Sequence, residues 1–201
     1  MDARAHAHAF RRVVATVAAL NLAYFAVEFA IAWSIGAVSL FADSIDFLED
    51  AAVNVLILLA TRWTARARAR TGRGLAMLLL VPAVAALWAV LEKVSAAEAP
   101  AAVPLTLGGG GALVVNTTCA LLLARWRNEA SSLSRAAWLS ARNDAAANVA
   151  IIAAGALTAA TLSHWPDVVV GIGIAAMNAD AARDVLAAAR REELDDVALD
   201  A

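Results

Sequence analysis

Six long apolar stretches constrain this chain more than any other feature of its sequence. The hydrocarbon core of a bilayer is about 30 Å thick, and a helix needs roughly 17 to 25 mostly apolar residues to cross it. Segments of that length cover residues 13–33, 40–60, 75–94, 103–123, 136–162 and 168–189. The sequence therefore predicts an all-α, polytopic membrane protein built as a six-helix transmembrane bundle. We expect one membrane domain over residues 1–190 and a short acidic tail over 191–201.

Composition agrees with a membrane location. Hydrophobic residues make up 62% of the chain, whereas soluble domains are about 45 to 50% apolar. The net charge of -2 and the lack of a basic patch interleaved with aromatics argue against a nucleic-acid partner. The single cysteine, Cys119, excludes a disulfide framework and a sulfur-rich metal site.

The distribution of arginines predicts the orientation, because cytoplasmic loops collect Lys and Arg near the ends of spans. On one side of an even-numbered bundle lie Arg4, Arg11, Arg12, Arg62, Arg66, Arg68, Arg70, Arg73, Arg125, Arg127, Arg135, Arg190 and Arg191. The loops on the opposite side offer only Lys93. We therefore expect both termini in the cytoplasm. The short chain, rich in arginine and alanine, suggests a bacterial inner membrane as the location. The first span is too long for the apolar part of a cleavable signal, so we expect it to be retained.

The second span carries four carboxylates within eight positions. A charged side chain at the centre of a bilayer costs about 2.5 to 3.5 kcal/mol on insertion scales, so four require a reason. Asp43, Asp46 and Asp50 follow one another at helical spacing, and Asn54 continues the same polar stripe, with Glu49 beside it. Ionised carboxylates this close repel each other, so protons, a cation or an arginine must compensate them.

The fifth span provides a second polar face. Ser140, Asp144 and Asn148 recur every four residues and share one side of a helix. Packing of this face against the second span would bring Asp46, Asp50 and Asp144 around one oxygen-rich pocket. A cation that displaces protons from such a pocket is the physical basis of an exchanger.

These motifs together resemble the cation diffusion facilitators, a family of divalent-metal/proton antiporters. The resemblance covers about residues 10–192 and is most specific in the second span, Gly36-Ala-Val-Ser-Leu-Phe-Ala-Asp43-Ser-Ile-Asp46 followed by Asp50. The other spans contribute Asn21 and Glu28, Glu92 and Lys93, Asn116, Asp144, and Trp165-Pro166-Asp167 with Gly171 and Gly173.

The resemblance implies a metal site between spans two and five. Asp46 and Asp50 match the family's two ligands in span two, and Asp144 matches the second ligand in span five. Ser140 occupies the position where the family usually has histidine or aspartate. We expect three carboxylates, completed by water, Ser140 or an amide such as Asn143. The candidate accessory residues are Asn143, Asp43, Glu49 and Asn21; Asp43 is either a gating group or a helix-packing acid.

An all-oxygen site of this kind favours hard ions such as manganese and does not separate them from zinc, cobalt or iron(II). The resemblance thus implies efflux of a divalent cation by proton-coupled alternating access, with the metal as substrate and no resident cofactor. Family members commonly carry a cytoplasmic domain after the sixth span, and residues 190–201 are too few to form one. Any homodimer is therefore expected to form through the membrane helices.

Two alternatives remain open from the residues. Arg142 could point into the pocket and replace the charge of the metal, which would give a non-transporting structural relative of the family. Membrane acids can also bind organic cations, which would give a proton-coupled exporter of those instead. An enzyme with Ser140 as nucleophile is not expected, because no histidine lies at membrane depth to activate the serine.

Overall fold

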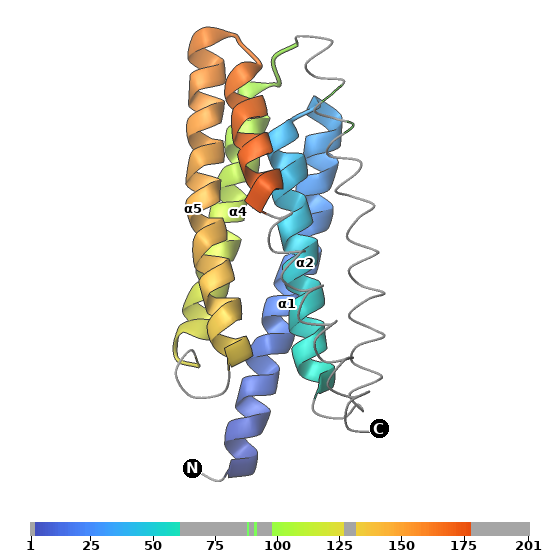
Figure 1. Ribbon diagram of the computed structural model, residues 1–201, viewed down its shortest axis with the longest axis vertical. Helices are drawn as coiled ribbons and strands as arrows, with labels where there is room; N and C mark the ends of the chain where they lie inside the picture. The colour runs from blue at the N-terminus through green and yellow to red at the C-terminus, as the bar shows by residue number, and fades with distance from the viewer. Residues whose placement is uncertain (1–2, 61–87, 89–90, 92–97, 127–131, 178–201) are drawn as a thin grey trace, which may run out of the picture.

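The computed structural model describes residues 3–60, 88, 91, 98–126 and 132–177, and the described chain is helical with short connections. Figure 1 shows the arrangement of the helices. Their bounds are α1, Ala3–Ile35; α2, Val38–Ala60; α4, Ala102–Ala124; α5, Ser132–Thr161; and a shorter helix, Trp165–Met177. Over these residues the all-α prediction is confirmed.

Four predicted spans coincide with α1, α2, α4 and α5 to within a few residues, except that α1 begins ten residues earlier than predicted. Within the described ranges, three helices are long and apolar enough to cross a membrane: His6–Ile35, Ala102–Ala124 and Ser140–Thr161. Helix α2 has sufficient length but carries the four acids. Of the predicted span 75–94, only Trp88 and Leu91 belong to the described residues. The later part of the predicted span 168–189 and the predicted domain boundary at residue 190 also lie outside the described residues.

The four labelled helices form two antiparallel pairs. Helix α1 runs antiparallel to α2, and α4 runs antiparallel to α5 (Figure 1). Each of these pairs packs along its length, while contacts of α1 with α4 and of α2 with α5 close the bundle. At one end the His6 ring packs edge-on against the Trp126 ring, with centroids 4.7 Å apart. The extension of α1 therefore covers the end of α4.

The turn between α1 and α2 depends on Gly36. This residue has a φ of 61°, in the left-handed region that costs glycine little. The Ala37 N–H then donates to the Ala32 carbonyl at 3.1 Å, as in a Schellman motif at a helix C-terminus. The chain can thus reverse within two residues and start α2 beside α1.

Asp167 fixes the start of α2 from a distant part of the sequence. Its carboxylate accepts hydrogen bonds from the backbone N–H of Val38 at 2.8 Å and of Ser39 at 3.0 Å, and from the Ser39 hydroxyl at 2.6 Å. The first N–H groups of a helix lack partners within the helix, and its dipole favours an anion there. Asp167, which is fully buried, therefore caps α2 and anchors helix Trp165–Met177 to it.

The same helix approaches α2 closely at Gly171. A Cβ at this position would lie 2.8 Å from the Val38 carbonyl carbon and 2.9 Å from the Ser39 nitrogen, both backbone atoms. At Gly173, two residues along, a Cβ would meet nothing within 4 Å. The two glycines provide a matched pair for a test of packing.

We expect Gly171→Ala to destabilise the protein by roughly 1 to 3 kcal/mol, because backbone atoms must shift to admit the methyl group. Gly173→Ala should leave stability unchanged or slightly higher, since alanine favours helix. Thermal unfolding of both variants in one detergent measures the difference. Equal unfolding midpoints for the two variants would contradict the close packing of this helix on α2.

Polar side chains form a layer in the middle of the bundle, between two apolar cores. One core lies near the α1–α2 turn and includes Leu40, Phe41 and Leu105; the other lies toward the opposite end and includes Val17, Leu123 and Ala141. The polar layer consists of the buried residues Asn21, Glu28, Asp43, Asp50, Asn54, Asn116, Asp144 and Asn148. Large apolar side chains such as Leu121 and Leu157 are exposed instead. A polar interior with an apolar exterior suits a lipid environment.

Candidate metal centre

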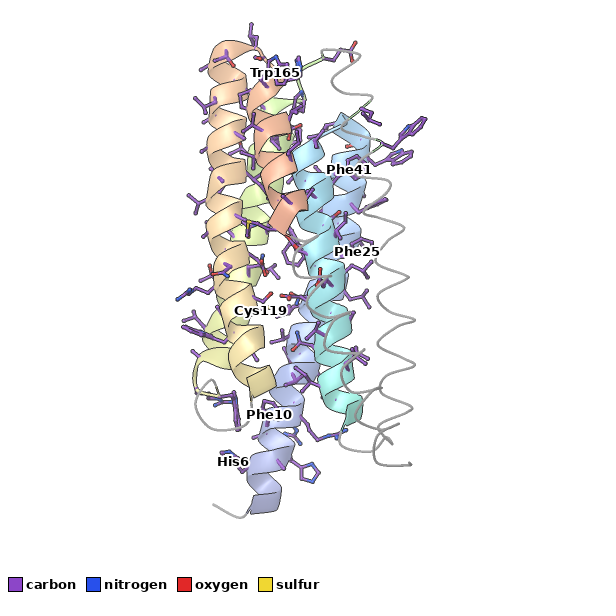
Figure 2. The ribbon with its side chains drawn as sticks, viewed as in Figure 1. His6, Phe10, Phe25, Phe41, Cys119 and Trp165 are labelled. Atoms are coloured by element: carbon purple, nitrogen blue, oxygen red, sulfur yellow. The ribbon has the colours of Figure 1, made fainter. Side chains whose placement is uncertain are left out.

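Helices α2 and α5 meet at a serine that lies between two carboxylates. The Ser140 hydroxyl is 3.0 Å from Asp50 Oδ1 and 3.4 Å from Asp144 Oδ2. Ser140 and Asp144 are one turn apart on α5, so their side chains project from the same face. Figure 2 shows oxygen-bearing side chains in the space between α2 and α5. The acids of the two helices therefore converge on a single hydroxyl group.

Asp50 is held on its other side by α1. Asn21 Nδ2 donates to Asp50 Oδ2 at 3.4 Å, and the Cys119 thiol of α4 donates to Asn21 Oδ1 at 3.5 Å. Asn54 Nδ2 donates to the Asp50 backbone carbonyl at 2.8 Å. Figure 2 places Cys119 at mid-height of the bundle, between the ends marked by His6 and Trp165. All four labelled helices thus contribute to the surroundings of Asp50.

Asp46 and Glu49 lie beside this group without joining it through a hydrogen bond. Both are partly buried. Asp144 has the strongest electrostatic interaction with Asp46, and Asp50 is the acid whose charge acts on Glu49. Over the described residues, no three His, Cys, Asp or Glu side chains are grouped so that they could hold a metal ion by themselves. Of the residues predicted for the site, the structure joins Asp50, Asp144, Ser140 and Asn21.

Arg142 and Asn143 face away from the acids. Both side chains are exposed, and Arg142 donates to Asn143 Oδ1 at 3.5 Å. The guanidinium carbon of Arg142 lies 5.4 Å from the centre of the Trp138 ring, a cation–π distance. Their positions follow from helical periodicity, since they lie two and three residues from Ser140. Arg142 thus leaves the space between the acids free, and Asn143 would have to turn inward to reach an ion.

Asp43 belongs to a second polar chain, one turn from Asp46. Asn148 Nδ2 of α5 donates to Asp43 Oδ2 at 2.6 Å, and Asn116 Nδ2 of α4 donates to Asn148 Oδ1 at 3.0 Å. This chain links α2, α5 and α4 at the level of the polar layer. Asp43 is fully buried and accepts a hydrogen bond from another helix.

Sequence reasoning overlooked two of these connections. The sequence suggested no partner for Cys119, yet its thiol donates to Asn21. Asn148 was placed on the polar face of the fifth span beside Asp144, yet its amide donates to Asp43. The sequence did indicate that these residues need partners, because a polar side chain on the inward face of an apolar helix must form a hydrogen bond. Spacing along one helix does not reveal which residue on another helix that partner is.

A helical bundle with an apolar surface and acids converging inside it is typical of integral membrane proteins with a functional polar interior. The family model for the cation efflux transmembrane domain matches residues 14–192. The chain therefore belongs to the cation diffusion facilitator family and is an integral membrane cation transporter. No curated protein gave a significant sequence match to the chain.

Proposed function

We propose that the protein exports a divalent metal ion from the cytoplasm in exchange for protons, and that the ion binds between α2 and α5. One observation carries this proposal. The Ser140 hydroxyl lies within hydrogen-bonding distance of both Asp50 on α2 and Asp144 on α5. An ion in that position would exchange the hydrogen bonds of the hydroxyl for coordination by the same three oxygens.

Asp46 is proposed as the fourth ligand. It lies one turn from Asp50, and its strongest electrostatic interaction is with Asp144. A rotation of its partly exposed side chain toward Asp144 would complete three carboxylates and one hydroxyl around the ion. Oxygen ligands of this kind suit manganese and also bind zinc, cobalt and iron(II).

The charges of the site support coupling to protons. Two ionised carboxylates about 4 Å apart repel by roughly 4 kcal/mol at an effective dielectric constant of about 20. When the ion leaves, that repulsion must be neutralised, and Arg142 faces away from the acids. Protons that bind the carboxylates can supply the compensating charge. Each proton that binds as the metal leaves ties the export of metal to the import of protons.

We further propose six spans with both termini in the cytoplasm of a bacterial cell, and a homodimer formed through the membrane helices. The exposed position of Arg142 weighs against a non-transporting relative, because that alternative needs its guanidinium among the acids. Export of organic cations predicts no competition among metal ions, so a competition assay with Zn²⁺, Mn²⁺ and Co²⁺ distinguishes that alternative.

Purified protein in proteoliposomes provides the test of the function. We expect Mn²⁺ or Zn²⁺ to accumulate in vesicles against its own gradient when an opposing pH gradient is imposed. A protonophore that collapses the pH gradient should abolish this accumulation. Accumulation that is equal in protein-free vesicles, or that ignores the protonophore, would contradict metal/proton antiport.

A further inference from the structure

Two buried acids outside the metal centre face each other across α1 and α2. Glu28 and Asp43 are each 0% exposed. Neither carboxyl oxygen of Glu28 has a hydrogen-bond partner in the described part of the chain, and the same holds for Asp43 Oδ1. Three acceptor atoms are therefore buried without a donor, a costly situation in a folded protein.

The rings of Tyr24 on α1 and Phe47 on α2 pack with their centroids 5.0 Å apart. Glu28 and Asp43 each lie one turn farther along this antiparallel pair, so their carboxyl groups project from facing positions. Two ionised carboxylates only accept hydrogen bonds, so this arrangement is repulsive unless one group carries a proton. Asp43 Oδ2 already accepts from Asn148 at 2.6 Å, a bond that favours the ionised form of Asp43. Protonated Glu28 can then donate its O–H to Asp43 Oδ1, which supplies the missing donor.

Within the part of the chain that the structure describes, the other neighbours of the pair offer no substitute for that proton. On α1, the Tyr24 hydroxyl donates its single hydrogen to the Gly108 carbonyl of α4 at 2.7 Å. The ionisable groups that act on the pair from α2 and α5 are Asp46 and Asp144, which are acids themselves. Helix α4 contributes the neutral Asn116, which reaches Asp43 only through Asn148.

We propose that Glu28 and Asp43 form a proton-binding site that holds one shared proton and is separate from the metal ligands. If the proposed function holds, this site also has a role in antiport. Asp43 lies one turn from Asp46, and Asn148 lies one turn from Asp144, so a divalent ion at the metal centre would favour loss of the shared proton. By linkage, binding of that proton would weaken binding of the metal to the same extent.

Infrared spectroscopy of the full chain in lipid vesicles without metal tests the proton site. A protonated carboxyl has a C=O stretching band that a carboxylate lacks and that shifts in D₂O. We expect Glu28→Gln to remove one carboxyl's share of this band near neutral pH. The glutamine amide can still donate to Asp43, so the variant should fold. Asp43→Asn should also remove it, whereas Glu98→Gln, a change at an exposed position, should leave it intact.

A wild-type spectrum without the band, or a band that survives Glu28→Gln unchanged, would overturn the proposal. A second measurement separates it from the function proposed above. If Mn²⁺ binds the wild-type protein, we expect the Glu28 band to decrease on binding and Glu28→Gln to release fewer protons per metal. A band that does not respond to bound Mn²⁺ would refute the coupling. Failure of Mn²⁺, Zn²⁺ and Co²⁺ to bind would refute the transport function. The proton site would still be tested by the infrared spectra of the metal-free wild type and Glu28→Gln.

Discussion

Replacement of Asp50 by asparagine is expected to abolish metal transport while the helical bundle stays folded. The change removes a charge from the carboxylate that accepts from both Ser140 and Asn21. Loss of a residue that only supports a metal ligand already costs about 10- to 100-fold in affinity or activity, so loss of a ligand should cost at least as much. Metal uptake by proteoliposomes under a pH gradient measures the effect.

The size and shape of asparagine keep the packing of α2 on α5, so unfolding is not the expected cause of the loss. The unfolding midpoint of Asp50→Asn should therefore stay close to that of the wild type. Glu98→Gln serves as the matched control, because it neutralises an exposed acid before α4, and it should transport at the wild-type rate. Metal flux at the wild-type rate in Asp50→Asn would show that Asp50 is not a ligand of the transported ion.

Replacement of Ser140 by histidine is expected to change which metal the protein prefers. An imidazole nitrogen at this position would replace the hydroxyl that lies between Asp50 and Asp144. Nitrogen ligands suit zinc better than manganese. We expect the ratio of Zn²⁺ to Mn²⁺ uptake to rise about tenfold or more, which corresponds to roughly 1.4 kcal/mol of differential binding.

Ser140→Ala is the control for this change. It removes the hydroxyl without adding a nitrogen, so affinity should fall for both metals and their ratio should change little. Competition between the two ions in a single uptake assay gives the ratio directly. An equal Zn²⁺ to Mn²⁺ ratio in the wild type, Ser140→His and Ser140→Ala would show that Ser140 does not contact the ion.

Hydrophobic length and helical periodicity were sufficient to predict most of the fold that the structure describes. Four helices of the described chain lie where apolar length places them. Apolar length predicts helices because a segment in a membrane must satisfy its own backbone hydrogen bonds. The four-residue spacing of Ser140 and Asp144 also predicts that the two side chains share one face of the helix. The position of Arg142 was left open by the sequence, and the structure shows its side chain exposed. The early start of α1 at Ala3 was missed, since its first turns contain His6 and Arg11 rather than a continuous apolar run.

Apart from the packing of α2 on α5 around Asp50 and Asp144, contacts between helices could not be predicted from the sequence. The hydrogen bond from the Val38 N–H to the Asp167 carboxylate joins residues separated by 129 positions. No local sequence pattern predicts this contact. The pairing of Glu28 with Asp43 likewise depends on how α1 packs against α2. Packing of whole helix faces determines these partners, whereas the spacing along one helix determines only which residues share a face.

The metal centre itself is tested most directly by crystals of the full chain grown with Mn²⁺ or Zn²⁺. We expect an anomalous difference peak between α2 and α5, with oxygens of Asp50, Asp144 and Ser140 about 2.0 to 2.3 Å from the ion. Asp46 should turn toward the same peak. Saturating metal with no peak between these helices, or a peak elsewhere in the bundle, would contradict a site shared by α2 and α5.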